Sequence, residues 1–286
     1  VFVQDYPPLK ALGISLFHSI AAFNNAGFDI LGNFQNLIPY RDDVMLNLVT
    51  CGLIFFGGIG FLVIREMWTK KFRWKKYSLH AKVVLVVSVL LIAAGTVLIK
   101  LTEEVTWLGA FFHSVSARTA GFSTYPLGAF SNAGLLVITV LMFIGASPGS
   151  TGGGIKTSTF FVLIQGIKSA ATNKSEKAFR HAIPKDAFHK AGVITVLALS
   201  VVVTGTWLMV VLEPDVSLMD AVFEITSAFG TVGLSTGITT GLGVGAKLLS
   251  VFVMYIGRLG PLTVASLWYF TRGERVSFPE GNISIG

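Results

Sequence analysis

This 286-residue sequence has a single cysteine and few charged residues for its length. Its single cysteine, Cys51, excludes an internal disulfide framework and gives no metal-site spacing, so we expect a small buried apolar side chain there. Only 13% of the residues are charged and 52% are hydrophobic, with a mean hydropathy of +0.71. A soluble domain of this composition would expose large apolar patches. The scarcity of charge therefore predicts a protein that lies in the lipid bilayer.

The net charge of +7 is concentrated in a few places. Loop 65–82 holds seven of the 22 Lys and Arg residues, loop 168–190 holds six, and Arg272 and Arg275 lie near the C-terminus. Each cluster flanks a long apolar run, as in the positive-inside pattern of membrane proteins. We therefore expect both loops and the C-terminus on the cytoplasmic side of the cell membrane, and no nucleic-acid partner.

The apolar segments fall into two lengths. Five of them approach the roughly 20 residues that a spanning helix needs: 43–64, 83–99, 130–168, 190–212 and 245–271. Three others are shorter: 9–24, 106–118 and 217–229. If 106–118 spanned the bilayer, the two basic loops would face opposite compartments. We therefore predict that the short stretches are re-entrant and leave by the face through which they enter.

Each short stretch ends in a similar glycine-centred turn, which indicates an internal repeat. Residues 23–29 read F-N-N-A-G-F-D, residues 117–123 read A-R-T-A-G-F-S, and residues 229–235 read F-G-T-V-G-L-S. The repeat predicts an all-α integral membrane fold of units that each contain a long helix, a re-entrant helix, a glycine turn and a second long helix. We expect these units in pseudo-fourfold arrangement around one pore.

The predicted units follow from the positions of the turns. Residues 1–78 form a partial unit without its first long helix, 79–185 form a complete unit with an interrupted second long helix, and 186–286 form a complete unit with a tail. Because the chain opens without an initiator methionine or a leading helix, we expect a further N-terminal unit outside this sequence.

The repeated turn is suited to binding a cation. Unwound backbone at membrane depth leaves carbonyl groups without partners, and a ring of carbonyl oxygens can replace the hydration shell of an ion. Glycine permits the backbone angles that direct successive carbonyls to one axis. Residues 231–234 read T-V-G-L, close to the core of potassium-channel filters. The predicted ion-binding residues are Asn25, Ala26, Gly27, Thr119, Ala120, Gly121, Thr231, Val232 and Gly233.

Segment 130–168 is interrupted in its middle, where residues 145–156 read G-A-S-P-G-S-T-G-G-G-I-K. Five glycines and a proline within ten residues cannot continue a helix. Gly149 and Gly154 have phosphate-loop spacing, but Ile155 stands where that motif needs lysine, so we reject nucleotide binding. A broken helix beneath a filter is placed to close the pore. The predicted gating residues are Gly149, Ser150, Thr151, Gly152, Gly153, Gly154, Lys156 and Arg258.

Four further polar residues need an interpretation. Arg258 lies deep in the last long segment, where a charge costs ~2.5–3.5 kcal/mol on insertion scales, so we expect it against loop 147–154, as a latch or as a partner for freed carbonyls. Arg118 precedes the second turn and would repel a cation unless it points behind the filter; we expect a carboxylate partner such as Glu224. His18 and His113 occupy matching positions, and packing is favoured over metal binding.

These motifs together resemble the Trk/Ktr/HKT superfamily of potassium transporters. The three turns, the G-S-T-G-G-G-I-K run and Y-I-G-R-L-G-P at 255–261 carry the resemblance, which is strongest to its KtrB-type membrane subunits. The resemblance implies four units around one pore, a homodimer, and a cytosolic RCK-type nucleotide-binding ring as regulatory partner. It implies K⁺ as the transported ion, with Na⁺ as a candidate modulator, and no organic cofactor in this chain.

Two other functions fit parts of the pattern. A secondary cation symporter with stoichiometric Na⁺ or H⁺ coupling also uses broken helices at mid-membrane, although such proteins typically show inverted repeats. An intramembrane enzyme would need a nucleophile and a base together, and Ser147 and Ser150 have no histidine near them in a spanning segment. We therefore expect a transport protein and not an enzyme.

Overall fold

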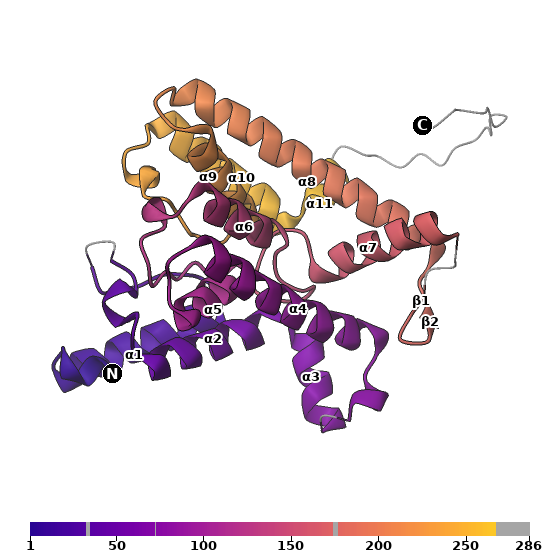
Figure 1. Cartoon of the computed structure of the whole chain (residues 1–286), viewed down its shortest axis with the longest axis horizontal. Coiled ribbons are helices and arrows are strands. Elements are labelled where there is room, and N and C mark those ends of the chain that lie inside the picture. Colours follow the sequence, from indigo (N-terminus) through magenta and orange to yellow (C-terminus); the bar gives the residue numbers. More distant parts are fainter. Residues whose placement is uncertain (33–34, 72, 174–176, 267–286) are drawn as a thin grey trace.

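A computed structural model describes residues 1–32, 35–71, 73–173 and 177–266 of the chain, and it is mainly helical (Figure 1). Helices α1 to α11 span, in order, Pro8–Phe23, Val44–Gly58, Phe61–Lys70, Leu79–Thr102, Trp107–Ser116, Asn132–Phe143, Thr157–Thr172, Lys185–Leu212, Leu218–Gly230, Val244–Leu259 and Pro261–Ser266. Short 3-10 helices occupy Phe2–Gln4, Ile38–Tyr40, Trp74–Lys76, Leu127–Ala129 and Ile238–Thr240. Arg272, Arg275 and the tail of the third predicted unit lie outside the described residues.

One element departs from the predicted all-helical fold. Strands β1 (Lys177–Ala178) and β2 (His181–Ala182) form a small antiparallel hairpin in the loop between α7 and α8. Phe179 and Arg180 at its tip both have positive φ, so the tip turns tightly enough for the two strands to pair. The hairpin belongs to a basic loop and not to the apolar body of the protein.

Polar residues fix where the helices begin. Asp43, Ser78, Thr106, Ser131 and Ser217 each precede a helix, and each side chain accepts a hydrogen bond from a backbone N–H in the first turn. An N-terminal side-chain cap of this kind contributes about 1 kcal/mol by satisfying a donor that the helix leaves free. The caps therefore define the starts of α2, α4, α5, α6 and α9.

The ends of each re-entrant segment are held together. Glu103, just after α4, accepts hydrogen bonds from Ser131 N at 3.0 Å and Ser131 Oγ at 2.6 Å, directly before α6. In the next unit Glu213, just after α8, accepts from Gly243 N at 2.6 Å, directly before α10. The chain between these contacts, which contains α5 in one unit and α9 in the other, thus leaves from and returns to the same end of the long helices. This geometry agrees with the predicted re-entrant stretches.

The predicted spanning segments are less continuous than expected. Only α4 and, within α8, Asp186–Leu212 are helices long and apolar enough to cross a membrane among the described residues. Segment 43–64 is instead bent by 100° between α2 and α3. The bend lies at Gly60, whose φ of 88° is open to glycine but strained for other residues. Gly260, with φ of 90°, separates α10 from α11 in the same way.

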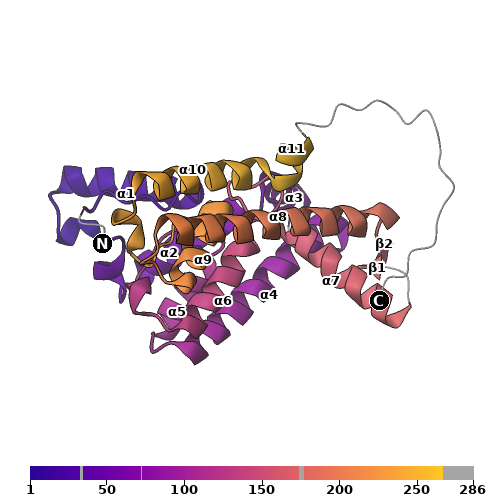
Figure 2. The same ribbon diagram turned by 90° about the horizontal axis from the view of Figure 1, so that it is seen from above.

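The helices of the second predicted unit lie between those of the other two. In Figure 1, α4 to α6 are seen between α1–α2 and α8–α10, and in Figure 2 they lie on the side opposite α1 and α10. Helix α5 packs against α4 and α2, and α9 packs against α6, α8 and α10. The three helix groups therefore occupy successive places around a common centre.

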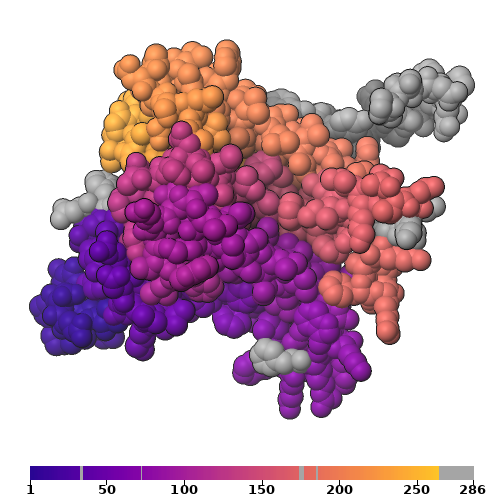
Figure 3. All heavy atoms as spheres, viewed as in Figure 1, coloured from indigo at the N-terminus to yellow at the C-terminus, as the bar shows by residue number. Residues whose placement is uncertain are grey.

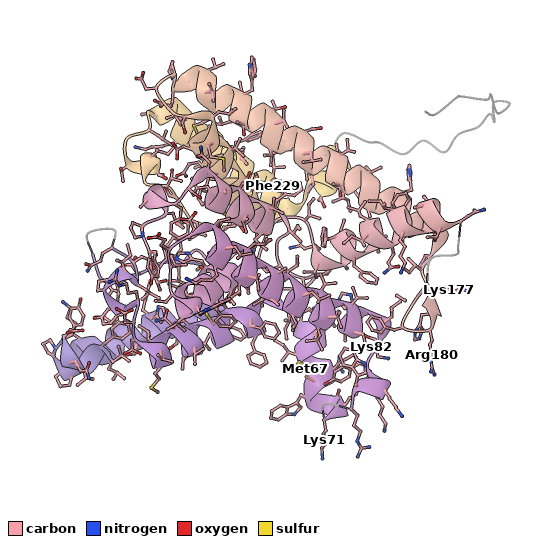
Figure 4. All side chains as sticks on the ribbon, viewed as in Figure 1. Met67, Lys71, Lys82, Lys177, Arg180 and Phe229 are labelled. Carbon is pink, nitrogen blue, oxygen red and sulfur yellow. The ribbon has the colours of Figure 1, made fainter. Side chains whose placement is uncertain are left out.

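The basic residues gather at one end of the molecule. Lys71, Lys82, Lys177 and Arg180 lie together at the free end of α3, the start of α4 and the β hairpin, far from Phe229 of α9 (Figure 4). Because α4 has 24 residues and a rise of ~1.5 Å per residue, its acidic end at Glu103 lies about 36 Å from its basic end. Residues of both basic loops lie at this same end of the molecule (Figure 4), and the cytoplasmic orientation of this end stays a prediction.

Replacing Glu103 by alanine tests the link between α4 and α6. The change removes both hydrogen bonds to Ser131, one of which satisfies a free N–H before α6, so we expect a loss of about 1–3 kcal/mol in stability. The thermal unfolding midpoint of the purified protein in detergent measures it. Glu104→Ala, at the exposed neighbouring position, is the control and should leave the midpoint unchanged. Equal midpoints for the two variants would contradict a structural role for Glu103.

Candidate ion-conducting site

The three glycine turns meet at the centre of the protein. A methyl group placed on Gly27 would lie 2.6 Å from the carbonyl oxygen of Ala120 and 2.9 Å from Cα of Gly121. A methyl group on Gly121 would overlap the carbonyl oxygen of Val232, and one on Gly233 would lie 3.9 Å from Cα of Gly121. Glycines that are 94 and 112 positions apart in the sequence are therefore neighbours in space, and two of the three approaches leave no room for a side chain.

The turns also share one backbone conformation. Asn25, Thr119 and Thr231 have positive φ values of 51°, 79° and 50°, although none is glycine. Two residues later, Gly27, Gly121 and Gly233 have φ values of 69°, 85° and 91°, whereas the residue between each pair has negative φ. Left-handed φ in a threonine is uncommon and costs energy, so its recurrence indicates a conformation that the surrounding structure imposes.

This conformation leaves the turn carbonyls free. Among the hydrogen bonds between described residues, none is accepted by a backbone carbonyl of residues 25–27, 119–121 or 231–233. Alternating left- and right-handed φ turns successive peptide groups the same way, so their oxygens can face one axis. A buried carbonyl without a partner costs about 1–3 kcal/mol or more. A dehydrated cation is a ligand that such a cluster of oxygens fits.

Side chains hold the first two turns against each other. The amide of Asn25 lies 3.3 Å from the hydroxyl of Thr119. Its other amide atom faces the carbonyl oxygens of Ala22 and Ile54, at 3.1 and 3.2 Å, so this atom is the NH₂ donor and the amide oxygen accepts from Thr119. Asn25 thus joins the first turn, the end of α1 and helix α2.

Glycines in the long helices back the turns. A methyl group on Gly57 of α2 would overlap the carbonyl oxygen of Phe23, and one on Gly257 of α10 would overlap that of Phe229. Phe23 and Phe229 occupy matching places at the ends of α1 and α9. The absence of a side chain lets each long helix touch the end of its own re-entrant helix, which sets the depth of the turn.

The interrupted segment 144–156 lies directly against the turns. A methyl group on Gly152 would overlap the side-chain hydroxyl of Thr119, and one on Gly153 would lie 2.6 Å from that of Thr231. Two of the loop glycines therefore contact threonines of two different turns. The loop crosses the space beneath the glycine cluster and does not lie at the periphery.

Backbone hydrogen bonds tie the loop to the bend between α2 and α3. Ser147 N donates to Gly58 O at 3.0 Å, Phe61 N donates to Gly149 O at 3.1 Å, and the hydroxyl of Thr151 donates to Gly57 O at 3.3 Å. A methyl group on Gly60 would lie 2.5 Å from the carbonyl oxygen of Pro148. The first unit therefore holds one side of the loop through its own glycine-rich bend.

Two cations hold the loop from the other side. Arg258 Nη1 donates to the carbonyl oxygen of Thr151, and Lys156 Nζ donates to that of Gly152 at 2.6 Å. Arg258 follows Gly257 in α10, as Gly58 follows Gly57 in α2. Matching positions of two units therefore form hydrogen bonds with the same loop. The structure thus places Arg258 against the loop, as the sequence predicts.

The predicted partner of Arg118 is wrong. Arg118 does point away from the turns and is buried, but its guanidinium donates to the carbonyl oxygens of Ser88 and Gly145, at 3.3 and 3.4 Å, instead of to a carboxylate. Glu224 accepts from the hydroxyls of Ser235 and Thr239. The helix break after α6 frees the carbonyl of Gly145, which explains why a cation is accommodated there without a counter-ion.

The two histidines are packing residues. His18 Nε2 lies 2.8 Å from Thr50 Oγ1, and the His18 ring meets the ring of Phe122 edge-on. His113 is fully buried and lies 3.5 Å from Thr124 Oγ1. Within the described residues, His, Cys, Asp and Glu form no group of three that could hold a metal ion. Cys51 is buried, as expected.

Several residues of the site escape sequence reasoning. Gly57 and Gly257 are recognised from the sequence as milder counterparts of the break at Gly145, but their close approach to the ends of the re-entrant helices is missed, and so are the contacts of Gly152 and Gly153 with the turn threonines. Gly57, Gly145 and Gly257 each stand 13 residues after the first residue of α2, α6 and α10. This common spacing is the signal that could have indicated a shared contact.

The fold and the site define a helical membrane protein built from pore-loop repeats. The family model described as "TrkH: Cation transport protein" matches residues 5–108 and 103–270. The solved structure of the potassium transporter TrkH from Vibrio parahaemolyticus has the same fold, with a TM-score of 0.70 at 18% identity, over 91% of this chain and 63% of that one. The chain therefore belongs to the TrkH family of cation transport proteins, which are transporters and not enzymes.

Curated relatives are similar over nearly the whole chain. The Ktr system potassium uptake protein B of Vibrio alginolyticus is 36% identical over 95% of this chain, and that of Bacillus subtilis is 36% identical over 99%. The potassium/sodium uptake protein NtpJ of Enterococcus hirae is 36% identical over 100%. This chain spans 62%, 66% and 67% of the lengths of these relatives.

Adding a methyl group at Gly57 tests the contact between α2 and the end of α1. Gly57→Ala would force the helix away from the carbonyl oxygen of Phe23, a backbone atom that cannot rotate aside, so we expect a loss of folded protein or of about 2 kcal/mol or more in stability. Gly52→Ala in the same helix is the control, because nothing lies within 4 Å of the added methyl group. It should be neutral or stabilising by up to ~1 kcal/mol.

Yield and thermal unfolding midpoint of the two variants measure the difference. A Gly57→Ala protein as stable as Gly52→Ala would contradict the close contact.

Proposed function

We propose that this chain supplies most of the pore of a potassium uptake protein, and that potassium ions pass between its three glycine turns. The convergence of Gly27, Gly121 and Gly233, with the carbonyls of all three turns free of hydrogen bonds, carries this proposal. The relatives named potassium uptake proteins support the choice of ion. The name potassium/sodium uptake protein of another relative keeps Na⁺ as a candidate modulator.

Each turn would contribute carbonyl oxygens to a selectivity filter. The ligands would come from Asn25–Gly27, Thr119–Gly121 and Thr231–Gly233, and the left-handed residues at both ends of each set would orient them. Ligands from backbone oxygens hold a monovalent cation without adding a negative charge, so the ion can both enter and leave. The hydroxyl of Thr119 and the amide of Asn25 would keep two turns in register.

Loop 149–154 would act as the gate. It lies against Thr119 and Thr231 of two turns, so an ion leaving the filter would have to pass it. Lys156 and Arg258 place two positive charges on adjacent loop carbonyls and would oppose a cation while the loop stays in place. Opening would need these hydrogen bonds and those to Gly57 and Gly58 to break.

The remaining features complete the proposed assembly. We place a further pore-loop unit between the third and first turns, because Gly121 has a neighbouring turn on both sides and Gly27 and Gly233 each have one. The units would be 1–78, 79–185 and 186–286. The basic loops 65–82 and 168–190 would face the cytoplasm, and the protein would form a homodimer on a nucleotide-binding RCK-type ring.

A symporter with stoichiometric ion coupling is the second candidate, because the interrupted helix α6–α7 lies at the centre of the protein. The direction of the repeats favours a pore instead. In Figure 1, α4 and α8 both start at the end of the molecule that carries the β hairpin and run toward α5 and α9, so the two units are parallel repeats and not inverted ones.

Substituting Gly233 by alanine tests the filter. The φ of 91° would strain an alanine by ~1–2 kcal/mol, whereas the added methyl group meets no atom closer than 3.9 Å, so the change acts on the backbone of the turn alone. We expect loss of selective potassium uptake when the full-length protein is expressed in a host that depends on it. Gly237→Ala is the matched control, because Gly237 has φ of 106° and open space around it but lies outside the turn. Equal uptake by both variants would rule out the proposed filter.

Deleting residues 149–154 tests the gate. The deletion removes the carbonyls that Arg258 and Lys156 hold, and we expect a raised basal potassium flux with retained selectivity. Potassium flux into vesicles that contain the full-length protein without its regulatory partner measures it. Unchanged or abolished flux in a folded deletion variant would exclude a gating role for the loop.

A further inference from the structure

An apolar groove opens on the outside of the protein between the second and third units. Its cavity has a volume of about 470 Å³. Helices α6, α7, α8 and α9 form its walls, and Figure 3 shows the surface on which α6, α7 and α8 lie. Its lining includes Phe143, Ile144, Ile155, Leu163 and Val202.

The matching seam between the first and second units is almost closed. It is lined by α2, α4 and α5 and encloses only about 20 Å³. Phe55 in this seam stands as far from the start of α2 as Phe143 in the groove stands from the start of α6. Likewise, Ile92 in the seam lies as far before Glu103 as Val202 in the groove lies before Glu213. The two seams therefore differ more than twentyfold in volume, in part because Arg118 lines the first seam and Gly230 holds the matching place before the third turn.

The course of segment 144–156 contributes to this difference. Only Ile59 and Gly60 separate α2 from α3, and α3 then packs on α4. In the second unit residues 144–156 separate α6 from α7 and fill the space beneath the turns instead of the seam. Helix α7 touches α8 closely only farther along, where a methyl group on Gly166 would overlap the ring of Phe188. The wall beside the loop is therefore left open.

The groove suits a hydrocarbon chain. Its lining has no charged residue. The hydroxyls of Thr139 and Thr195 donate to carbonyls of their own helices, at 2.7 and 2.8 Å, and that of Thr226 is buried without a hydrogen-bond partner among the described residues. The groove opens beside α8, which is long and apolar enough to cross a membrane. On the same helix Val203, next to Val202 of the groove, is 66% exposed. The medium against such a surface is the acyl region of the bilayer. A groove that holds apolar surface away from water gains most from an apolar occupant.

An occupant would touch both ends of segment 144–156, which contains loop 149–154. Ile144 begins this segment and Ile155 lies near its end, and both line the groove. Ile155 N donates to Phe143 O at 3.1 Å, so the two stems are bonded to each other. Packing against these residues stabilises the paired stems and hence the loop conformation in which the filter is blocked.

We propose that a phospholipid acyl chain occupies the groove between α6, α7, α8 and α9 and holds the stems of loop 144–156 together. Through this chain, lipid of the bilayer regulates the gate. The proposal rests on the gating role assigned above to this loop. It assigns the regulation to the lateral groove and to no group inside the pore.

Tryptophan substitution in the groove tests occupancy. The full-length protein is reconstituted in vesicles of phosphatidylethanolamine and phosphatidylglycerol with a phospholipid that carries a photoreactive group in its acyl chain, and labelled peptides are mapped. Val202→Trp and, from the opposite wall, Leu163→Trp fill the groove and should remove most labelling of peptides from α7 and α8 that line it. Val203→Trp, on the exposed face of α8, is the control and should leave labelling unchanged. Gel filtration and thermal unfolding establish that each variant is folded.

Potassium flux tests the coupling to the gate. Unbranched oleoyl chains fit the groove and methyl-branched phytanoyl chains fit it poorly, so we expect basal flux to be lower in oleoyl vesicles by about fivefold or more. Val202→Trp and Leu163→Trp should abolish this dependence on the acyl chain, and Val203→Trp should keep it.

The outcomes separate three ideas. Labelling that persists in both groove variants overturns lipid occupancy. If these variants lose dimerisation instead of labelling, lipid occupancy is also overturned, because a second copy of the chain would then cover the groove. Lost labelling with unchanged chain dependence overturns the coupling. If deletion of 149–154 leaves flux unchanged while labelling follows the groove variants, the gate itself is wrong and lipid occupancy stands.

Discussion

Peptide carbonyls exposed at membrane depth are the constraint on which the rest of the structure depends. Each of the three turns unwinds directly after a short helix, and water does not satisfy its oxygens as it would in a soluble loop. Under the proposed function, the turns converge so that one cation can be shared by their oxygens. Among the described residues, the nine carbonyls of the turns accept no hydrogen bond. A bound cation would therefore stabilise the fold as well as pass through it.

Small residues allow the turns, the long helices and the loop to approach one another. Gly27, Gly121, Gly57 and Gly257 each face a backbone atom where a side chain would not fit. The same feature suits loop 149–154 to the proposed role of a gate, because Gly152 touches a turn threonine without a large side chain of its own. The loop is held by separate hydrogen bonds, each with a net contribution of about 1 kcal/mol between neutral groups and about 1.5–3 kcal/mol where the donor is Lys156 or Arg258. Such a loop can change position at moderate cost.

The sequence predicts the repeats, the re-entrant stretches, the break in segment 130–168 and the place of Arg258, because these follow from hydropathy, charge and glycine patterns that act locally. It does not predict the 100° bend after α2, because a single left-handed glycine at position 60 resembles many glycines that leave helices intact. The Arg118 partner is missed for another reason: one of its two carbonyl acceptors, Gly145 O, is free only because α6 ends at Phe143. The open groove likewise depends on how far α7 diverges from α8, which no local pattern records.

Anomalous scattering from crystals of the full-length protein soaked in thallium ions tests the central claim most directly, because Tl⁺ is a monovalent substitute for K⁺ that diffraction can locate. The account predicts a peak enclosed by the carbonyl oxygens next to Gly27, Gly121 and Gly233, with loop 149–154 on one side of it. A peak bound elsewhere, or turn carbonyls that point away from a common centre in the presence of the ion, would contradict it.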